Sequence, residues 1–472
     1  MRQVNYIASP PFLAHVTNVA RLIDTVIKND YCIGCGGCAS MEGSPLRMSL
    51  DEFGKLRPVL DLSIHNDPKV QLVCPFSDEA LNEDLLGKEI FGNQISHNEK
   101  LGYFINTYAG HVLESDFRDR GSSGGMGSWI LVELLRQGLV DKVIHVRGNS
   151  PSNDDPKLFS FDISSEIDEI RRGAKSRYYP VEMSNVISVM RRTPGRYVIV
   201  GIPCFIKAIR LLAREDPLIA QRIKFCVGLV CGHLKSAKFA EFQAWQCGIK
   251  PDNLLSIDFR TKLSGLPADK YGIEVKGKDG MERISPVSQL YGHDWGLGFL
   301  KYNACDFCDD VVAETADITI GDAWLPKYVR DSRGTNIVIV RNALFDKLIQ
   351  AAIKDGRIVM ERITPGETIA SQESGFRHRR EGLAYRLYKA DQRVLWHPPK
   401  RVKPNRFRFN YLFRKIQQYR MLISRHSHLA FLEAVAADDL SLFVRRMAPL
   451  VKRYNFYIKC NHMMRKLTSL IK

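Results

Sequence analysis

The sequence predicts a mixed α/β fold, with a small cysteine-rich part before the core and a mainly helical extension after it. Three observations support this prediction. A strand, a glycine-rich loop, a helix and a second strand follow one another between residues 108 and 147; eight of the 11 cysteines form two groups of four; and the last hundred residues carry the whole excess of positive charge. We expect the three parts to span residues 1–100, 101–372 and 373–472, each large enough to bury a core.

The first part is expected to hold an iron–sulfur cluster. Apolar residues at helical spacing over 12–27 predict an amphipathic helix, which leads to a group that consists of Cys32, Cys35, Cys38 and Cys74, the last followed by proline. Three cysteines at consecutive two-residue spacing and a remote Cys-Pro are typical of a 4Fe-4S cluster. The glycines among them, at 34, 36 and 37, permit the positive φ angles of such a wrap. We therefore expect a ferredoxin-like module, with a four-cysteine zinc site as the alternative.

The core is expected to begin near residue 103 with an α/β unit. Strands are predicted over 108–112 and 141–147, and a helix over 126–138 that ends at a glycine. The loop before this helix is Gly121-Ser-Ser-Gly-Gly125. Glycine-serine loops are usually ordinary turns. Glycines also open the backbone to phosphate oxygens, however, and the start of the following helix attracts such oxygens.

The second cysteine group comprises Cys204, Cys231, Cys305 and Cys308. Cys204 follows an apolar run at 197–200 and Cys231 follows another at 225–230. Both are expected where buried strands end, which is where open α/β sheets bind cofactors. Spacing alone leaves two interpretations: one cluster held by all four thiolates, or buried structural cysteines beside an unrelated Cys-x-x-Cys knuckle. The remaining cysteines, Cys226, Cys247 and Cys460, are interpreted as structural. Of these, Cys226 is the one alternative to Cys231 as a ligand.

Six ordered motifs resemble the beta subunit family of coenzyme F420 hydrogenases and dehydrogenases, which includes hydroxymethyl-chlorophyll reductases. They lie between about Cys32 and Arg341 and comprise residues 121–125, 201–204, 231–233, 259–262, 305–308 and 316–324. The resemblance implies FAD bound to the core and a 4Fe-4S cluster on the second cysteine group, beside the cluster on the first. Some bacterial relatives associated with exopolysaccharide synthesis carry extensions like the one in this chain.

The resemblance also implies two flavin-binding segments. The first comprises Gly121, Ser122, Ser123, Gly124 and Gly125, and the second comprises Lys175, Ser176, Arg177 and Tyr178. In the second segment arginine replaces the lysine of the family's Ser-Lys-Tyr contact, and either cation can neutralise a phosphate. A bulky side chain at Gly124 is expected to occupy the space of the flavin phosphates and to remove FAD.

The candidate catalytic residues are Arg260, Lys262 and Asp322. Two cations one residue apart project from the same side of an extended segment, so Arg260 and Lys262 can hold an anionic substrate or a flavin oxygen; a solvated strand edge is the alternative. Asp322 is expected either to stabilise the cluster loop or to relay a proton. The tryptophans at 295, 324 and 396 are interpreted as core or interface residues.

The extension is strongly basic. Residues 373–472 contain 23 Lys/Arg and 6 Asp/Glu, a net charge of +17, whereas residues 1–372 sum to −1. Helical periodicity over 410–471 predicts two or three amphipathic helices, which either pack on the core with a solvated cationic face or dock on an acidic partner or membrane surface. The nearly neutral body argues against specific nucleic-acid binding. Without an apolar run of spanning length or a signal peptide in residues 1–16, the expected location is the cytoplasm or the inner face of the membrane.

Together these observations predict an iron–sulfur flavoprotein oxidoreductase. Its clusters are expected to relay single electrons to FAD, which exchanges a hydride with an organic substrate, either the deazaflavin coenzyme or a compound of a polysaccharide pathway. The expected partner is a redox donor such as ferredoxin or a hydrogenase or dehydrogenase subunit. The alternatives are a zinc-stabilised nucleic-acid-binding or scaffold protein, and a non-catalytic assembly factor associated with the membrane.

Overall fold

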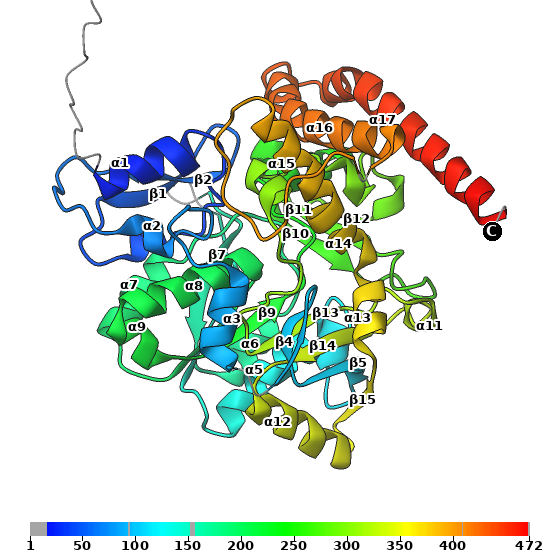
Figure 1. The fold of residues 1–472 in the computed structure, drawn as a ribbon. Coiled ribbons are helices and arrows are strands. Elements are labelled where there is room, and N and C mark those ends of the chain that lie inside the picture. Colours follow the sequence, from blue (N-terminus) through cyan, green and yellow to red (C-terminus); the bar gives the residue numbers. More distant parts are fainter. Residues whose placement is uncertain (1–16, 93–94, 152–155, 408, 471–472) are drawn as a thin grey trace, which may run out of the picture.

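The computed structural model describes residues 17–92, 95–151, 156–407 and 409–470. Its largest sheet is mixed, has eight strands and lies in the lower half of the view in Figure 1. The strand order is β15-β5-β14-β13-β9-β8-β6-β7. The strands are β5 (Asn106–Val112), β6 (Lys142–Gly148), β7 (Phe159–Ser164), β8 (Tyr197–Gly201), β9 (Ile223–Leu229), β13 (Ile318–Asp322), β14 (Asn336–Val340) and β15 (Ile358–Arg362). The four middle strands β13, β9, β8 and β6 are parallel, and the outer strands join them antiparallel.

Helices cover both faces of this sheet. One face packs against α5 (Met126–Arg136) and α12 (Ala343–Lys354), with the short helices α4 (Phe117–Arg120) and α6 (Ile167–Arg172) beside them. The other face packs against α7 (Ser184–Arg192), α8 (Pro203–Glu215) and α9 (Pro217–Arg222). Adjacent strand residues serve opposite faces, because side chains alternate along a strand: Val198 faces α5 and Ile199 faces α8.

The α/β unit predicted from the sequence is confirmed. The strands expected over 108–112 and 141–147 are β5 and β6, and the helix expected over 126–138 is α5. Gly138, just beyond that helix, has a left-handed φ of +62°, as a glycine that ends a helix often has. The apolar runs ahead of Cys204 and Cys231 form the buried strands β8 and β9.

The N-terminal part packs against α8. It contains α1 (Asn18–Leu22), the π-helix η1 (Ile23–Ile27), the 3-10 turn η2 (Cys38–Ser40), the hairpin β1 (Leu46–Leu50) and β2 (Leu56–Leu60), α2 (Val70–Val73), α3 (Glu83–Phe91), and the hairpin β3 (Ser96–Asn98) and β4 (Gly102–Phe104). The helix expected over 12–27 is observed from Asn18 onward. Its first residues, and the segment 1–16 in which no signal peptide is expected, lie outside the described residues.

A second, smaller sheet was not predicted. It is antiparallel and consists of β10 (Leu254–Thr261), β11 (Gly272–Gly277) and β12 (Glu282–Pro286), backed by α10 (Lys238–Gln246). Short turns complete this region: η3 (Pro251–Asn253), η4 (Val287–Gln289), η5 (Trp295–Leu297), η6 (Asn303–Phe307) and α11 (Pro326–Val329). The extended segment that carries Arg260 is the end of β10.

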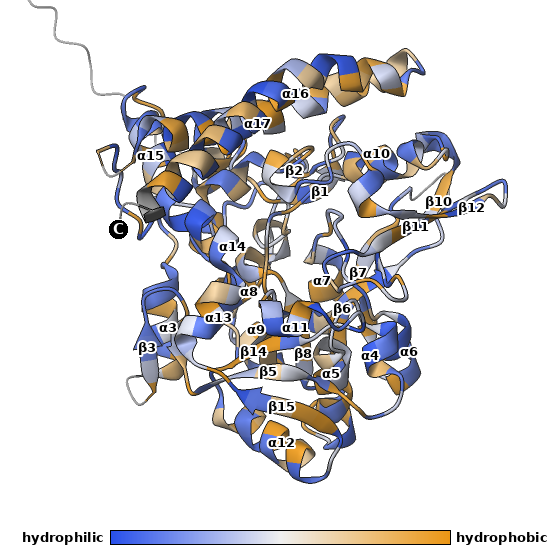
Figure 2. Cartoon of the chain, turned by 90° about the vertical axis from the view of Figure 1, so that its right-hand side faces the viewer, coloured by the Kyte–Doolittle hydropathy of each residue, from blue (hydrophilic) through white to orange (hydrophobic). Residues whose placement is uncertain are grey.

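The C-terminal part is helical, as expected, and it packs on the core. It comprises α13 (Pro365–Ser371), α14 (Glu373–Arg377), the π-helix η7 (His378–Gly382), α15 (Leu383–Asp391), α16 (Tyr411–Ala436) and α17 (Leu440–Leu470). Phe431 of α16 and Phe443 of α17 contact Phe242 of α10, with ring centroids 6.0 and 4.5 Å away. Figure 2 shows hydrophilic and hydrophobic residues alternating along both helices. These contacts favour packing, the first of the two alternatives for the extension.

In the described part of the chain, no helix combines the length and the apolar composition that crossing a membrane requires.

Candidate functional site

A cavity of about 530 Å³ lies at the carboxyl ends of the parallel strands. Gly201 of β8, Leu229 of β9 and Asp322 of β13 all contribute to its wall. These strand ends meet at one edge of the sheet, which is where open α/β folds bind their ligands. The cavity is also lined by the two segments predicted to bind FAD and by Arg260; of the residues proposed for this site, Gly124 and Lys262 alone are absent from the wall.

The glycine-rich loop reaches the cavity between α4 and α5. Gly125 has a φ of +89°, and a Cβ there would lie 2.7 Å from the backbone nitrogen of Arg118, so only glycine fits. Gly124 faces the other way: its Cβ would lie 2.8 Å from the carbonyl oxygen of Gly110 in the sheet. A larger residue at Gly124 therefore clashes with β5 and does not enter the cavity, which corrects the reason given for the expected loss of FAD.

The segment 173–178 forms the adjoining wall. The backbone N–H of Ser176 donates a 2.8 Å hydrogen bond to Oγ of Ser122, which ties this segment to the glycine-rich loop. The ammonium of Lys175 pairs with Asp258 at 2.9 Å. The ring of Tyr178 lies 4.8 Å from that of Trp295. The two segments predicted to share a flavin are thus joined directly.

Arg260, which is buried, and Asp322, which is half-buried, form an ion pair on the cavity wall. Nη1 of Arg260 donates to Oδ2 of Asp322 at 3.1 Å and to Oη of Tyr178 at 3.4 Å, and Nη2 donates to the carbonyl oxygen of Ser122 at 3.4 Å. Burial acts to lower the pKa of Arg260, but Asp322 and two neighbouring tyrosines raise it well above its ordinary value. The guanidinium therefore stays charged beside the cavity, and its Nε has no hydrogen-bond partner among the described residues.

Lys262 lies behind the glycine-rich loop and not on the cavity wall. Its ammonium donates to the carbonyl oxygens of Arg118 and Ser123, the latter at 3.0 Å. Burial, followed by the nearby Lys175 and Arg118, lowers the pKa of Lys262 to about 8. Arg260 and Lys262 do project toward the same loop, but the contacts of Lys262 are those of a residue that holds the loop in place.

Aromatic residues interpreted as core from the sequence form part of the cavity. Trp295 and Trp324 both line it, and the ring of His233 stacks on Trp295 with 4.4 Å between centroids and 17° between planes. Nε2 of His233 is buried and has no hydrogen-bond partner in the described part of the chain. Burial, and then Lys235 and further cations, lower the pKa of His233 well below its ordinary value, so the imidazole is neutral.

The first cysteine group is assembled in the N-terminal part. Burial raises the pKa of Cys38 well above its ordinary value, and the neighbouring thiols Cys35, Cys32 and Cys74 raise it further. Backbone N–H groups point at two of the sulfurs: Gly34 donates to Cys32 Sγ at 3.3 Å and Gly37 to Cys35 Sγ at 3.5 Å. Gly34 and Gly36 have the expected positive φ angles, +68° and +80°, while Gly37 is helical at −58°.

The second group comes together from three segments. Cys204 lies in the first turn of α8, Cys231 follows β9, and Cys305 lies in η6 three residues before Cys308. Burial raises the pKa of Cys204 well above its ordinary value, and the other three thiols of the group, and Cys35 of the first group, raise it further. Cys226 does not belong to this group: the charged groups that act on its thiol are Arg210 and Asp317, and none of the four cysteines is among them.

The two thiol groups therefore adjoin each other, through Cys204 and Cys35, and the second reaches the cavity, because Cys231 lines it. Soft thiolates in fours, with backbone N–H groups aimed at sulfur, fit the ligand requirements of iron–sulfur clusters. Among the described residues, no three or more His, Cys, Asp or Glu side chains are arranged so as to hold a single metal ion.

A cation from the C-terminal part contacts the second group. Nη2 of Arg379 donates to Cys231 Sγ at 3.6 Å and to the carbonyl oxygen of Gly232 at 2.8 Å, and Nη1 donates to the carbonyl oxygen of Asp310. Arg379 is 1% exposed. Sequence reasoning missed this residue, because nothing in the local pattern of η7 distinguishes it from the arginines beside it.

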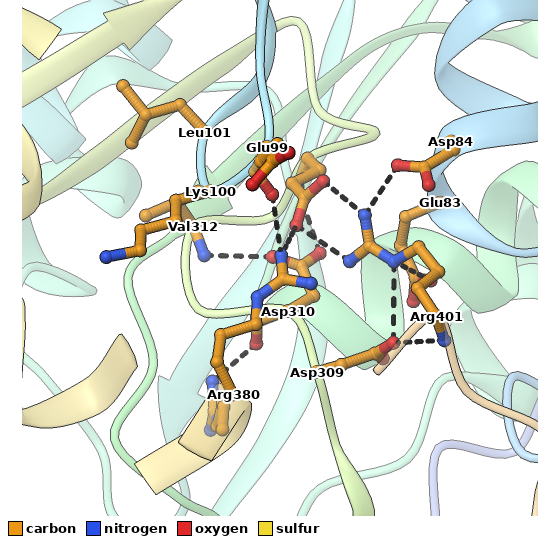
Figure 3. Close-up of polar contacts among 12 residues, drawn as sticks. Glu83, Asp84, Glu99, Lys100, Leu101, Asp309, Asp310, Val312, Arg380 and Arg401 are labelled. Carbon is orange, nitrogen blue, oxygen red and sulfur yellow. Dashed lines mark hydrogen bonds and ion pairs between the residues drawn. The ribbon is translucent and has the colours of Figure 1, made fainter. Parts of the chain in front are cut away.

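An ion-pair network surrounds the segment after Cys308 (Figure 3). Arg401 donates two hydrogen bonds to the Glu314 carboxylate, at 2.6 and 2.8 Å, and another to Asp84 at 2.7 Å, while Arg380 reaches Glu314 at 3.2 Å. Burial, and then Glu314 and Glu83, raise the pKa of Asp310 to about 7. Arg380 and Arg401 belong to the extension, and Asp84 and Glu314 belong to the body, so the network joins the two.

Comparisons with known proteins point to one group of relatives. Residues 107–188 match the N-terminal family model of the coenzyme F420 hydrogenase/dehydrogenase beta subunit, and residues 195–366 match the C-terminal model of the same family. The coenzyme F420 hydrogenase subunit beta of Methanothermobacter thermautotrophicus is 21% identical over 281 residues, covering 56% of this chain and 88% of the relative. A chain from the F420-reducing NiFe hydrogenase complex of Methanosarcina barkeri matches with a TM-score of 0.47 and 15% identity, covering 64% of this chain and 96% of that one.

Proposed function

Because the chain belongs to the coenzyme F420 hydrogenase/dehydrogenase beta subunit family and is thus an oxidoreductase, we propose that it uses FAD and two 4Fe-4S clusters to exchange electrons with a small organic substrate. The FAD is assigned to the 530 Å³ cavity. One cluster is assigned to each cysteine group. The first group and the extension lie outside the matched residues 107–366, so their part in this function rests on their own geometry.

One observation carries the proposal: the two thiol groups and the cavity form a continuous series. Thiols of both groups pack in or against one buried cluster, in which Cys35 acts electrostatically on Cys204, and Cys231 of the second group lies on the cavity wall. Eight cysteines that only stabilised the fold would not have to form two adjacent groups, and neither group would have to reach a ligand cavity. A relay for electrons requires this order.

The side chains of this protein would bind and orient the flavin. Bound FAD would supply the conversion between single-electron and hydride transfer, and the clusters would supply the single electrons. The backbone of the loop 121–125 and the start of α5 offer N–H groups to phosphate oxygens. Arg260, held by Asp322, places a fixed positive charge beside the cavity. Trp295 and Tyr178 give the cavity an aromatic wall, on which the rings of a flavin could pack.

The substrate belongs to one of two classes in this proposal: the deazaflavin coenzyme in the names of the relatives, or a compound of a polysaccharide pathway. The partner is a redox protein that delivers or accepts electrons at the first cysteine group. Support for this entry point comes from exposure: two thiols of the first group, Cys32 and Cys74, are half-buried, against one of the second, Cys204.

Metal and flavin content test the proposal. Anaerobically purified protein is expected to contain FAD, about eight iron atoms and about eight acid-labile sulfides per chain. Cys35→Ser is expected to remove about half of the iron and sulfide, because one of two four-thiolate sites loses a ligand.

Cys226→Ser is the matched control, since Cys226 is equally buried but lies apart from both groups. It is expected to keep the full iron, sulfide and FAD content. Stoichiometric zinc without labile sulfide would overturn the proposal in favour of the zinc-stabilised alternative.

A further inference from the structure

A second cavity, of about 340 Å³, opens beside the flavin cavity. It lies between α6 with the segment after it and the outer face of β10 and β11. The two cavities share a wall formed by Ala174, Lys175 and Arg177. The two cavities are therefore immediate neighbours, separated only by this short segment.

The lining of the second cavity is strongly cationic. Its charged residues are two carboxylates, Asp258 and Glu274, and six cations: Arg120, Arg171, Arg172, Lys175, Arg177 and Lys276. A cavity lined by an excess of one charge concentrates ligands of the opposite charge.

Most of these cations already have partners. Arg120 and Arg171 both pair with Asp116, Lys175 pairs with Asp258 at 2.9 Å, and Lys276 pairs with Glu282 at 2.8 Å. Asp258 and Glu274 are thus occupied by lysines.

Two arginines of the lining make no ion pair with a carboxylate of the described chain: Arg172 at the end of α6, and Arg177. The guanidinium of Arg177 lies 4.9 Å from the ring centroid of Phe159, and its Nε is buried without a hydrogen-bond partner among the described residues. Asp258 acts on Arg177 only from beyond ion-pair distance. Arginine matches phosphate oxygens with two parallel N–H groups, so two arginines outside such ion pairs can serve as a phosphate site.

The backbone at the junction of the cavities is strained. Lys175 has a φ of +136°, a value that residues other than glycine rarely adopt, and such strain concentrates at ligand sites. This conformation lets Lys175 reach Asp258 while the next residue, Ser176, donates its N–H to Ser122 of the glycine-rich loop. The segment is thereby fixed between the two cavities.

We propose that the second cavity binds a phosphate or diphosphate group through Arg172 and Arg177, and that this group belongs to a ligand whose other end occupies the flavin cavity. The inference deepens the proposed function, on which the identity of the ligand rests. The group comes either from the diphosphate of FAD or from a phosphorylated organic substrate. Both sources present the same chemistry to the two arginines.

Binding of inorganic pyrophosphate to the full-length protein tests the proposal. Calorimetry is carried out on the protein as purified and after removal of its flavin. The double variant Arg172→Gln with Arg177→Gln is expected to bind pyrophosphate roughly tenfold or more weakly than the unaltered protein, since each change removes a charge-assisted contact. Arg177→Lys, which keeps the charge, should lose less.

Arg445→Gln is the matched control, because Arg445 is an exposed arginine of α17, far along the chain from the cavity. Thermal unfolding of each variant establishes that it is folded. Binding only after flavin removal, together with lower FAD retention by the double variant, assigns the cavity to the diphosphate of FAD. Binding to the flavin-loaded protein, with FAD retained by the double variant, assigns it to a phosphorylated substrate.

Pyrophosphate binding of equal strength by the double variant and the unaltered protein overturns the proposal. So does a lack of pyrophosphate binding in both forms of the unaltered protein. A protein that contains neither flavin nor iron would contradict the proposed function instead, and the pyrophosphate measurement can still be made on it.

Discussion

Glycines a few residues apart near the cavity in which we propose that FAD binds have different structural roles. Gly124 packs against the sheet, where a Cβ would meet the backbone of Gly110 and Asn336 within 2.9 Å. Gly127, in the first turn of α5, lines the cavity, and a Cβ there would meet no atom within 4 Å. A substitution at Gly124 therefore tests folding, whereas one at Gly127 tests the contents of the cavity.

Gly127→Phe is expected to prevent FAD binding without lowering the thermal unfolding temperature. Its ring would fill space that the flavin needs, while removal of a helical glycine is neutral or slightly stabilising, by about 0.5–1 kcal/mol. FAD released by heat from the purified protein is the measurement, and Gly127→Ala, with a side chain too small to fill the cavity, should retain FAD. Full FAD content in Gly127→Phe would place the flavin elsewhere.

Elements with continuous apolar runs could be predicted from the sequence, and elements that depend on distant partners could not. The residues of β8, Tyr-Val-Ile-Val-Gly, form a buried strand by composition alone. By contrast, β12 has the exposed residues Glu282, Arg283 and Ile284, and it is a strand because β11 pairs with it. Tertiary pairing of this kind leaves little trace in local sequence.

The residues of the candidate site also fall into two kinds: those that local sequence patterns reveal, and those that depend on contacts between distant parts of the chain. The cysteine groups and the loop 121–125 could be recognised because spacing and glycine content are local patterns. The contact of Arg379 with Cys231 joins residues 148 positions apart. It also depends on the π-helical turn η7 between α14 and α15, and such turns are frequent at functional sites.

Arg379→Gln is expected to make the reduction potential of the cluster proposed for the second cysteine group more negative. A positive charge beside Cys231 favours the reduced, more negatively charged state, and this variant removes it. A hydrogen bond from a charged group contributes about 1.5–3 kcal/mol, and for one electron each 1.4 kcal/mol corresponds to about 59 mV. Redox titration followed by electron paramagnetic resonance measures the shift.

Two variants make this measurement specific. Arg377→Gln removes a cation of the adjacent helix that pairs with Glu373 and should leave the potential unchanged. Arg379→Lys should give a smaller shift than Arg379→Gln, because the charge is kept. An unchanged potential in Arg379→Gln at full iron content would show that the arginine has only a structural role.

At the scale of the whole molecule, the basic extension and the nearly neutral body are joined by internal ion pairs and hydrogen bonds. Arg379, Arg386 and Arg401 belong to the basic extension but are buried against the body. Glu314 is 1% exposed and pairs with Arg380 and Arg401 of the extension. Part of the net charge of +17 is therefore neutralised within the fold and is not available to an external partner.

A chain truncated after Gly375 is consequently expected to lose iron and FAD and to aggregate, contrary to the behaviour of an independent docking segment. Glu314 and Asp309 would be left buried without their cations, and removal of one partner of a buried pair costs about 3–5 kcal/mol. A chain truncated after Tyr457 should stay folded with full cofactor content, because it keeps the buried Phe443, Met447 and Tyr454 of α17. Iron and flavin analysis of the soluble fractions compares the two, and retention of cofactors after Gly375 would show that the extension is separable.

The cover that residues 396–401 form over the N-terminal part also sets an order of events during biosynthesis. Arg401 pairs with Asp84, and the hydroxyl of Tyr31, next to Cys32, donates to the carbonyl oxygen of Trp396. At about 5–20 residues per second, the roughly 370 residues from Cys32 to Arg401 take on the order of 20–75 s to emerge from the ribosome. During that interval the first cysteines exist on a nascent chain without their final cover. The cofactor proposed for these thiols would therefore be delivered either to this open intermediate or after the chain is released, and the segment that carries Trp396 and Arg401 would cover it.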